Sequence, residues 1–469
     1  MRTGMSTGEI SFNAAVAFLF GVFAANMGWN IVLLCVAWII GVITIAIFFW
    51  SRWLWKYILI VFFSASAGII YYFIFIHWQI AHTNLPSGKQ NFFAVATEEP
   101  KSAGNFTMIV ASLLHPYAGT LDIFTSSGND QFHYGDQFWV QGKITPSKNV
   151  GDPPVLFLPR LRVVATHQGF WLKANVIDFK IFIIKEITQA LPVDQAALLA
   201  GIMVGTTGTI SAALKAQMEI SGTTYIVNMY GYKIAIIIAA LVVALKDRVP
   251  RKILLWLTLA IIVFFVFASG GTISAIRAAI MGSFAVIARG MGRVFSARNA
   301  VTFAALGMVI VNATLLTDAG FQLSFLSFLG IYYLGPPINN YFHWTNGGVL
   351  QWKEHAMLSL ATNLAILPIV MNTFGEFSLT SFVSNILIMI PWLAVIVFGT
   401  LVVLFSFVSP ILAFSATTMV SIFLQYELFI IRLFSILTIP FPAVFDSPFA
   451  IAFYYGILII FIRYYAAPA

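Results

Sequence analysis

The chain has few of the residues on which soluble enzymes and secreted domains depend. Only 9% of its 469 residues are charged, against about 25% in soluble domains. Cys35 is the single cysteine, so a disulfide within the chain and a cysteine metal cluster are both excluded. The composition therefore points away from a soluble globular protein and towards one that has lipid as its solvent.

Short motifs of common catalytic chemistry are also missing. The sequence has no phosphate-binding glycine-rich loop, no serine nucleophile elbow and no His-Glu-x-x-His zinc motif. Four of its seven histidines fall within residues 81–170, but their spacing fits no metal-ligand pattern. We therefore predict that the chain is not an enzyme and binds neither a cofactor nor a metal.

Long apolar runs dominate what is present. Hydrophobic residues make up 60% of the chain, with 45 Phe and a mean hydropathy of +0.91. Because about 20 apolar residues in a helix cross a bilayer, these runs predict an α-helical polytopic membrane protein with about 10–12 transmembrane segments. The runs cover about 12–27, 29–50, 53–79, 223–245, 253–269, 272–290, 299–316, 318–334, 355–371, 380–407, 411–436 and 448–465.

Four regions follow from this pattern. Residues 1–80 hold the N-terminal transmembrane helices, and residues 192–469 form a polytopic transmembrane domain. Residues 81–170 contain β-rich runs separated by Gly, Pro, Asn and Asp, which predicts a small extracytoplasmic all-β domain of OB-like type. Residues 171–191 mix charged and apolar side chains, which indicates an amphipathic interfacial helix, with a partly buried linker helix as the alternative. The expected strands are Phe92–Thr97, Phe106–Leu114, Thr120–Thr125, Gln137–Ile144 and Val155–Thr166.

The net charge of +8 is unevenly placed. Residues 81–170 are neutral, with six basic and six acidic side chains, so the excess positive charge flanks the apolar runs. Under the positive-inside rule, the basic loops at 246–252 and 289–298 lie in the cytoplasm together with both chain termini. Attraction to a polyanion is a second interpretation of the same charge.

Polar side chains inside apolar runs are the candidate functional residues, because such groups are costly in hydrocarbon and usually face a bundle interior or a water-filled path. Arg277 requires a partner there, which is either Asp318 in a helix-locking ion pair or a phosphate group. The candidates for a polar channel interior are Arg277, Asp318, Gln322, Ser324, Lys233, Asn228, Asn363 and Asn385.

Several of these residues also have ordinary interpretations. Lys233 lies among Tyr225, Tyr230 and Tyr232, which is typical of a membrane interface, or of a pore mouth where rings stack on bases. The asparagines are suited to hydrogen bonds between helices. In the β-rich block the aromatic candidates either fill the barrel core, which we favour, or stack on bases. They are Phe132, Tyr134, Phe138 and Trp139.

Short phrases occur in a fixed order over about 192–391, and this ordered set resembles the competence domain of the ComEC family. These are the DNA-internalisation membrane channels of naturally competent bacteria. The phrases are the segment 198–208, Ile220-Ser-Gly-Thr-Thr-Tyr225, Ile276-Arg-Ala-Ala-Ile-Met281, Asp318-Ala-Gly-Phe-Gln-Leu-Ser-Phe325, Leu367-Pro368, Phe374-Gly-Glu-Phe-Ser378, Asn385 and Pro391. Two departures stand out. Where the family usually has a His, a second Ser-Gly and another His, this chain has Tyr225, Tyr230-Gly231 and Lys233. The chain also resembles a short form that lacks the C-terminal metallo-β-lactamase-like domain.

This resemblance implies translocation of single-stranded DNA into the cytoplasm across the bacterial cytoplasmic (inner) membrane. Membrane lipid, an outer DNA receptor, a cytoplasmic ATPase or helicase and a separate nuclease are the implied partners. Two other functions remain open: a secondary transporter of a small or lipidic solute, and a membrane scaffold that transports nothing.

Overall fold

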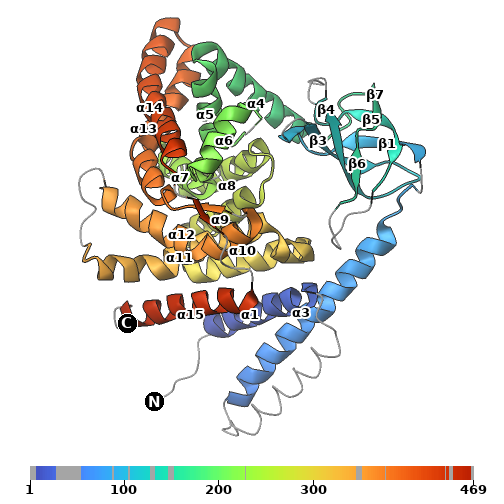
Figure 1. Ribbon diagram of the computed structural model, residues 1–469, viewed down its shortest axis with the longest axis vertical. Coiled ribbons are helices and arrows are strands. Elements are labelled where there is room, and N and C mark those ends of the chain that lie inside the picture. The colour runs from blue at the N-terminus through green and yellow to red at the C-terminus, as the bar shows by residue number, and fades with distance from the viewer. Residues whose placement is uncertain are drawn as a thin grey trace. The chain divides into compact units, whose positions relative to one another are not determined.

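The protein is described by a computed structural model (Figure 1). It covers residues 7–27, 54–86, 89–103, 106–126, 132–145, 153–206, 208–227, 229–344, 351–374, 376–438, 440–442 and 447–465. The predicted run 29–50 and the candidate Asn228 lie outside these described residues. The chain divides into two compact units, each treated by itself below. The first comprises Met1–Phe170, Ile237–Val263 and Ile276–Phe321, and the second comprises Trp171–Ile236, Phe264–Ala275 and Gln322–Ala469.

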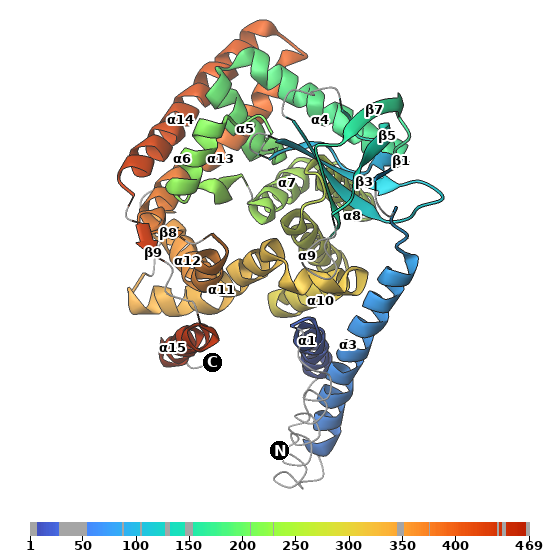
Figure 2. The ribbon, with the colours of Figure 1, turned by 45° about the vertical axis from the view of Figure 1, so that its right-hand side comes forward.

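Close helix crossing characterises the N-terminal part of the first unit. Helix α1 (Thr7–Asn26) packs against α3 (Leu54–His82) (Figure 2). A Cβ on Gly21 or on Gly68 would overlap the backbone of the opposite helix, so only glycine permits this approach. The unit also contains α8 (Arg251–Ala268, through Val263), α9 (Ile273–Gly290, from Ile276), α10 (Ala297–Val311) and the 3₁₀ turn η2 (Ala313–Thr317).

The β-rich block forms the predicted small β domain. Its seven-stranded sheet has the order β6-β4-β3-β1-β5-β7, with β2 paired to β3. A bridge between Thr145, just after β5, and Val155 joins β6, at one end of this order, to the end of β5, so the strands from β6 to β5 close into a barrel and β7 pairs with β5 beside it. The strands are β1 (Lys89–Ala96), β2 (Lys101–Ala103), β3 (Phe106–Leu113), β4 (Thr120–Ser126), β5 (Gln137–Lys143), β6 (Val155–Phe157) and β7 (Arg160–Ala165).

One predicted strand proves to be two. The run Val155–Thr166 is interrupted at Leu158, whose φ of +47° is incompatible with a strand, and at Pro159, which cannot donate to a sheet. Phe138 is fully buried in the core of the domain, and the ring of Phe132 packs edge-on against it at a centroid distance of 5.2 Å. These two aromatics are therefore core residues, as we favoured, and Phe138 is not available for base stacking.

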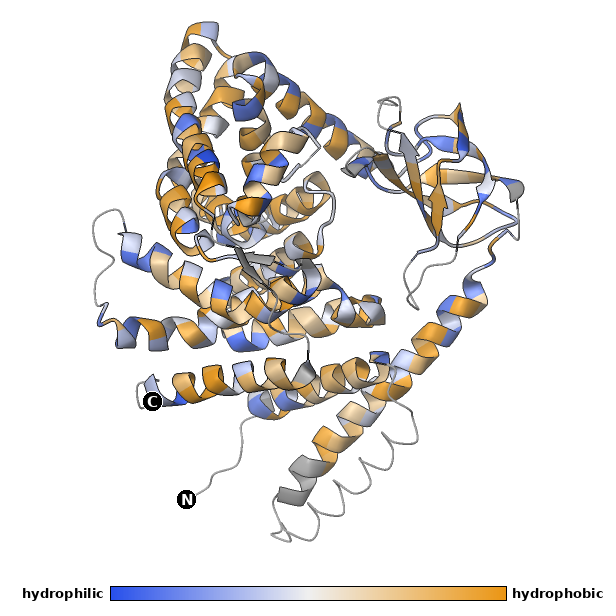
Figure 3. Ribbon diagram, viewed as in Figure 1, coloured by the Kyte–Doolittle hydropathy of each residue, from blue (hydrophilic) through white to orange (hydrophobic). Residues whose placement is uncertain are grey.

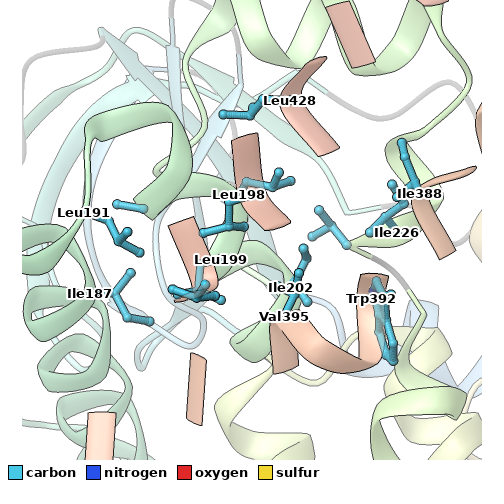
Figure 4. Packing of buried hydrophobic residues seen from close by; sticks show 14 of the residues in the cluster. Ile187, Leu191, Leu198, Leu199, Ile202, Ile226, Ile388, Trp392, Val395 and Leu428 are labelled. Carbon is cyan, nitrogen blue, oxygen red and sulfur yellow. The ribbon is translucent and has the colours of Figure 1, made fainter. Parts of the chain in front are cut away.

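The second unit is a helical bundle around one large apolar core. Side chains from α4, α5, α13 and α14 meet there, including the fully buried Leu198, Leu199 and Ile388 (Figure 4). Its helices are α4 (Trp171–Ala190), α5 (Val193–Val204), α6 (Ala212–Ile220), η1 (Thr224–Ile226), the first part of α7 (Tyr230–Leu245), α11 (Ala319–Tyr341, from Gln322), α12 (Trp352–Phe374), α13 (Ser381–Ser406), α14 (Pro410–Ile436) and α15 (Pro448–Tyr465). The short strands β8 (Glu376–Ser378) and β9 (Pro440–Pro442) pair with each other.

Apolar helices of membrane-spanning length confirm a multi-pass membrane protein. Among the described residues, seven helices are long and apolar enough to cross a bilayer: α1, α3, α8, α9, α12, α13 and α14. Four shorter apolar helices accompany them, and hydrophobic residues recur along the ribbons (Figure 3). The total of about 10–12 spans remains a prediction.

Two continuous helices contain a proline, and tyrosines from neighbouring helices bond the carbonyls that these prolines leave free. A proline has no N–H and leaves the carbonyl four residues earlier without its helical partner. Pro391 of α13 frees the carbonyl of Leu387, and Tyr426 of α14 donates its hydroxyl to that oxygen at 3.3 Å. Pro368 of α12 likewise frees the carbonyl of Leu364, to which Tyr454 of α15 donates at 2.7 Å. The two prolines are thus tolerated inside apolar helices because tyrosine hydroxyls bond the carbonyls that they leave free.

Candidate functional site

A helix break opens the segment between α6 and α7 in the second unit. The sequence pattern predicts an uninterrupted span over 223–245, whereas α7 begins at Tyr230. Helix α6 ends in a Schellman motif, because Thr223 N–H donates to Met218 O and Gly222 N–H donates to Glu219 O. Gly222 has a φ of +68°, and a Cβ there would overlap the side chain of Ser381. Glycine is therefore required for both conformation and contact.

Buried polar side chains gather beside this break, and we call them the polar band. They come from the break itself, from α12 and from the start of α13. Every member is buried: Ser221, Thr223, Ser359, Asn363, Ser381, Ser384 and Asn385.

Hydrogen bonds link the polar band across segments that are far apart in the sequence. Ser384 Oγ of α13 donates to Ser221 O at 2.9 Å, and the hydroxyls of Ser221 and Thr223 share a bond of 2.9 Å. Asn363 Nδ2 donates to Ser359 O at 2.9 Å, and Ser359 Oγ donates in turn to the carbonyl of Phe382. The band thus joins α12, α13 and the break through uncharged groups.

Two atoms of the polar band have no hydrogen-bond partner within the described part of the chain. They are Ser381 Oγ and Asn385 Oδ1, both on the first turns of α13. Native proteins satisfy nearly all buried polar atoms, so an unsatisfied one needs an explanation of its own. These atoms have hydrogen-bonding capacity left for water or for a polar solute.

Lys233 ties the break to the end of α5. Only 3% of the residue is exposed, and Nζ donates to Val227 O at 2.7 Å and to Gly201 O at 3.1 Å. The ammonium also lies 4.9 Å from the ring centroid of Tyr230, which gives a cation–π contact. Lys233 is therefore a buried link between α5, the break and α7.

The Asp318 phrase takes a different place from the one expected. Asp318 is an exposed N-cap residue of α11, and its Oδ1 accepts a hydrogen bond from Phe321 N–H at 2.8 Å. Arg277 is half-buried on α9, with Nη1 3.9 Å from Met281 Sδ. Gln322 is half-buried and Ser324 is buried on α11. A channel wall formed by these four residues, and an ion pair between Arg277 and Asp318, remain predictions.

The remaining aromatic candidates belong to the β domain. The Tyr134 hydroxyl accepts a hydrogen bond from Phe170 N–H at 3.0 Å, which ties the turn before β5 to the end of the domain. Trp139 is half-buried on β5. A contact of these two side chains with bases stays a prediction.

Sequence reasoning missed Glu427, a fully buried acid in α14. It lies in a run of core positions with Val420, Leu424 and Ile431, at spacings of four, three and four residues. An acid at this spacing in an apolar run is the sequence signal that identifies Glu427 as a buried residue. Among the described residues, no group of three or more His, Cys, Asp or Glu side chains is arranged to hold a metal ion.

Comparison with known families decides the assignment. The family model described as "Competence protein" matches residues 202–468, which is more than half of the chain. The chain belongs to the competence protein family. The resemblance seen in the ordered phrases is thereby confirmed, and the family assignment supports a role in DNA uptake. The break, the polar band, Lys233 and Glu427 all fall within the matched residues. No curated protein and no solved structure matches the chain.

Proposed function

We propose that the chain is a channel protein that translocates single-stranded DNA across the bacterial cytoplasmic membrane during natural transformation. The observation that carries this proposal is the polar band, whose members are buried in an apolar bundle and include atoms with unused hydrogen-bonding capacity. Polar groups at such positions mark transport paths in membrane proteins. The family assignment supplies DNA as the substrate class.

The chemistry of the band suits a moving polyanion. All its members are serine, threonine or asparagine, so its wall offers hydrogen bonds without charge. Conduction requires contacts strong enough to admit the substrate and weak enough to release it. A wall of Lys and Arg would bind phosphates strongly, because affinity for nucleic acid is dominated by neutralisation of phosphate charge. The nearby Lys233 does not add such a trap, since its ammonium is engaged by two carbonyls and a ring.

In this proposal both termini lie in the cytoplasm and the β domain lies outside. An outer receptor delivers the DNA, and a cytoplasmic ATPase or helicase draws the strand inward. A separate nuclease removes the second strand. The basic loops at 246–252 and 289–298 support the orientation under the positive-inside rule.

Uptake of labelled DNA in cells lacking the native gene tests the proposal. The comparison is between the wild-type chain, Asn385→Leu and the matched control Thr400→Val. Asn385 has a buried oxygen without a partner among the described residues, whereas Thr400 is exposed on the same helix and donates to its own helix backbone. Replacing an unpaired buried polar group by an apolar one of similar shape costs little stability. We therefore expect normal protein levels for both variants and loss of internalised DNA for Asn385→Leu alone.

Normal DNA uptake in the Asn385→Leu variant would contradict a path along the polar band. Normal uptake in the deletion strain itself would contradict an essential role in DNA entry. In that case, accumulation of a small or lipidic solute in vesicles containing the chain would favour a secondary transporter. Absence of any transport would favour a scaffold.

A further inference from the structure

Glu427 is an acidic residue where the helix pattern calls for an apolar one. It lies within the stripe of α14 that faces the bundle core, together with Val420, Leu424 and Ile431. Its exposed fraction is 0%, and both carboxyl oxygens lack a hydrogen-bond partner among the described residues. A carboxylate stripped of water and left without donors is strongly disfavoured relative to the neutral acid.

The helices that pack most extensively against α14 bring no cation to this carboxyl. They are α13, α5 and α6. Helix α13 has no Asp, Glu, Lys or Arg in its sequence. Asp194 of α5 is half-buried and forms an ion pair of 2.9 Å with Arg432, the only basic residue of α14. On α6 the charged side chains are Lys215 and Glu219, and both are exposed.

A carbonyl of the adjoining helix α13 that lacks its helical partner lies beside this part of α14. Tyr426, the residue before Glu427, donates to Leu387 O, the carbonyl that Pro391 leaves free in α13. This hydrogen bond links the two helices beside the buried acid, in addition to the apolar side chains that pack between them. A helix bends more easily where a proline removes a backbone hydrogen bond, so packing can rearrange there. The carboxyl is therefore next to a joint between α13 and α14.

We propose that Glu427 is a proton-binding site of the membrane-spanning bundle, neutral while α14 is packed on α13 and able to release its proton when the two helices part. A proton is the ligand that fits best, because a sodium or potassium ion needs several oxygen ligands and the surrounding stripe is aliphatic. The proposal does not depend on DNA being the transported substrate.

Labelling with dicyclohexylcarbodiimide tests the site in the full chain reconstituted in liposomes. This apolar reagent takes up the proton of a carboxylic acid, and the carboxyl oxygen then adds to its central carbon, so one reagent is gained and no group leaves. We expect the peptide containing Glu427 to gain this mass at mildly acidic pH. The label should fall as the pH is raised, and it should be absent in Glu427→Gln. The exposed Glu219 serves as the internal control and should remain unlabelled.

Infrared spectroscopy of the wild-type protein gives a measurement that needs no variant. A buried neutral carboxyl should show a C=O band of the protonated acid that persists at neutral pH. Absence of that band together with absence of carbodiimide labelling would overturn the proposal. Suppression of labelling by sodium or potassium at constant pH would also overturn it, since the site would then hold a metal cation.

Discussion

The β domain and the helical bundle of the second unit bury polar groups in opposite ways. The core of the β domain consists of apolar side chains such as Ile109, Leu121 and Phe138, and its buried Asp136 accepts a hydrogen bond from His133 N–H. The bundle buries polar atoms that lack partners among the described residues, on Ser381, Asn385 and Glu427. The β domain therefore has the core of a structural module, whereas the bundle keeps groups that packing alone does not explain.

This contrast predicts that substitutions in the core of the β domain lower stability, whereas substitutions of the polar band in the bundle lower DNA uptake. The largest expected effect on stability is that of Ile109→Ala, because Ile109 is fully buried on β3. Such a truncation leaves a cavity and costs about 2–5 kcal/mol of folding free energy. Thermal unfolding of the purified protein should show the loss, while uptake per folded molecule stays normal. Phe93→Ala is the control, since Phe93 is 42% exposed on the neighbouring strand. Loss of DNA uptake by folded Ile109→Ala protein would contradict a purely structural role for the core of the β domain.

Lys233→Met should have the next largest effect, now in the bundle. Methionine preserves the apolar length of the side chain but removes the donors to Val227 O and Gly201 O. Leaving a buried carbonyl unpaired costs about 1–3 kcal/mol. Denaturant unfolding in detergent should report this loss, and Lys215→Met, on the exposed face of α6, should report almost none. Equal stability of the two variants would show that Lys233 does not hold the break.

Tyr426→Phe and Tyr454→Phe should have smaller effects, of about 1 kcal/mol each. Each variant removes the hydroxyl that satisfies a carbonyl freed by proline, at Leu387 or Leu364. Tyr455→Phe is the matched control, because Tyr455 donates to Ala365 O, and Ile369 retains the N–H that a helix directs to that carbonyl. The same unfolding measurement should rank Tyr454→Phe below Tyr455→Phe in stability. The reverse order would contradict the view that the Tyr454 hydroxyl replaces the hydrogen bond to Leu364 O that Pro368 removes.

Much of the fold followed from local patterns in the sequence. The predicted spans 380–407 and 411–436 correspond to α13 (Ser381–Ser406) and α14 (Pro410–Ile436), since their apolar runs are long and clearly bounded. Four of the five predicted strands match observed strands closely, whereas β2 has three residues and no pattern to reveal it. The fifth predicted strand is divided at Leu158, whose positive φ ends the first of the two observed strands.

The candidate site was less accessible to sequence reasoning. The hydrogen bond between Ser384 and Ser221 joins residues that are 163 positions apart, and no local sequence pattern predicts it. The motif of Ser221 and Gly222 marked the right segment. Only the folded chain shows that the missing side chain of Gly222 leaves the space that Ser381 occupies. Glu427 was within reach, because an acid at a core position of a spanning helix is visible from spacing alone. Asp318 shows the opposite case, since a conspicuous polar residue in an apolar stretch caps a helix.

The pairing of Pro391 with Tyr426 constrains the order in which the two positions can change during evolution. If Pro391 is replaced first, the new residue supplies an N–H for Leu387 O and the tyrosine hydroxyl becomes dispensable. If Tyr426 is replaced first, the carbonyl is left unpaired in an intermediate that selection disfavours. We therefore expect homologous chains that have lost the tyrosine to have lost the proline as well.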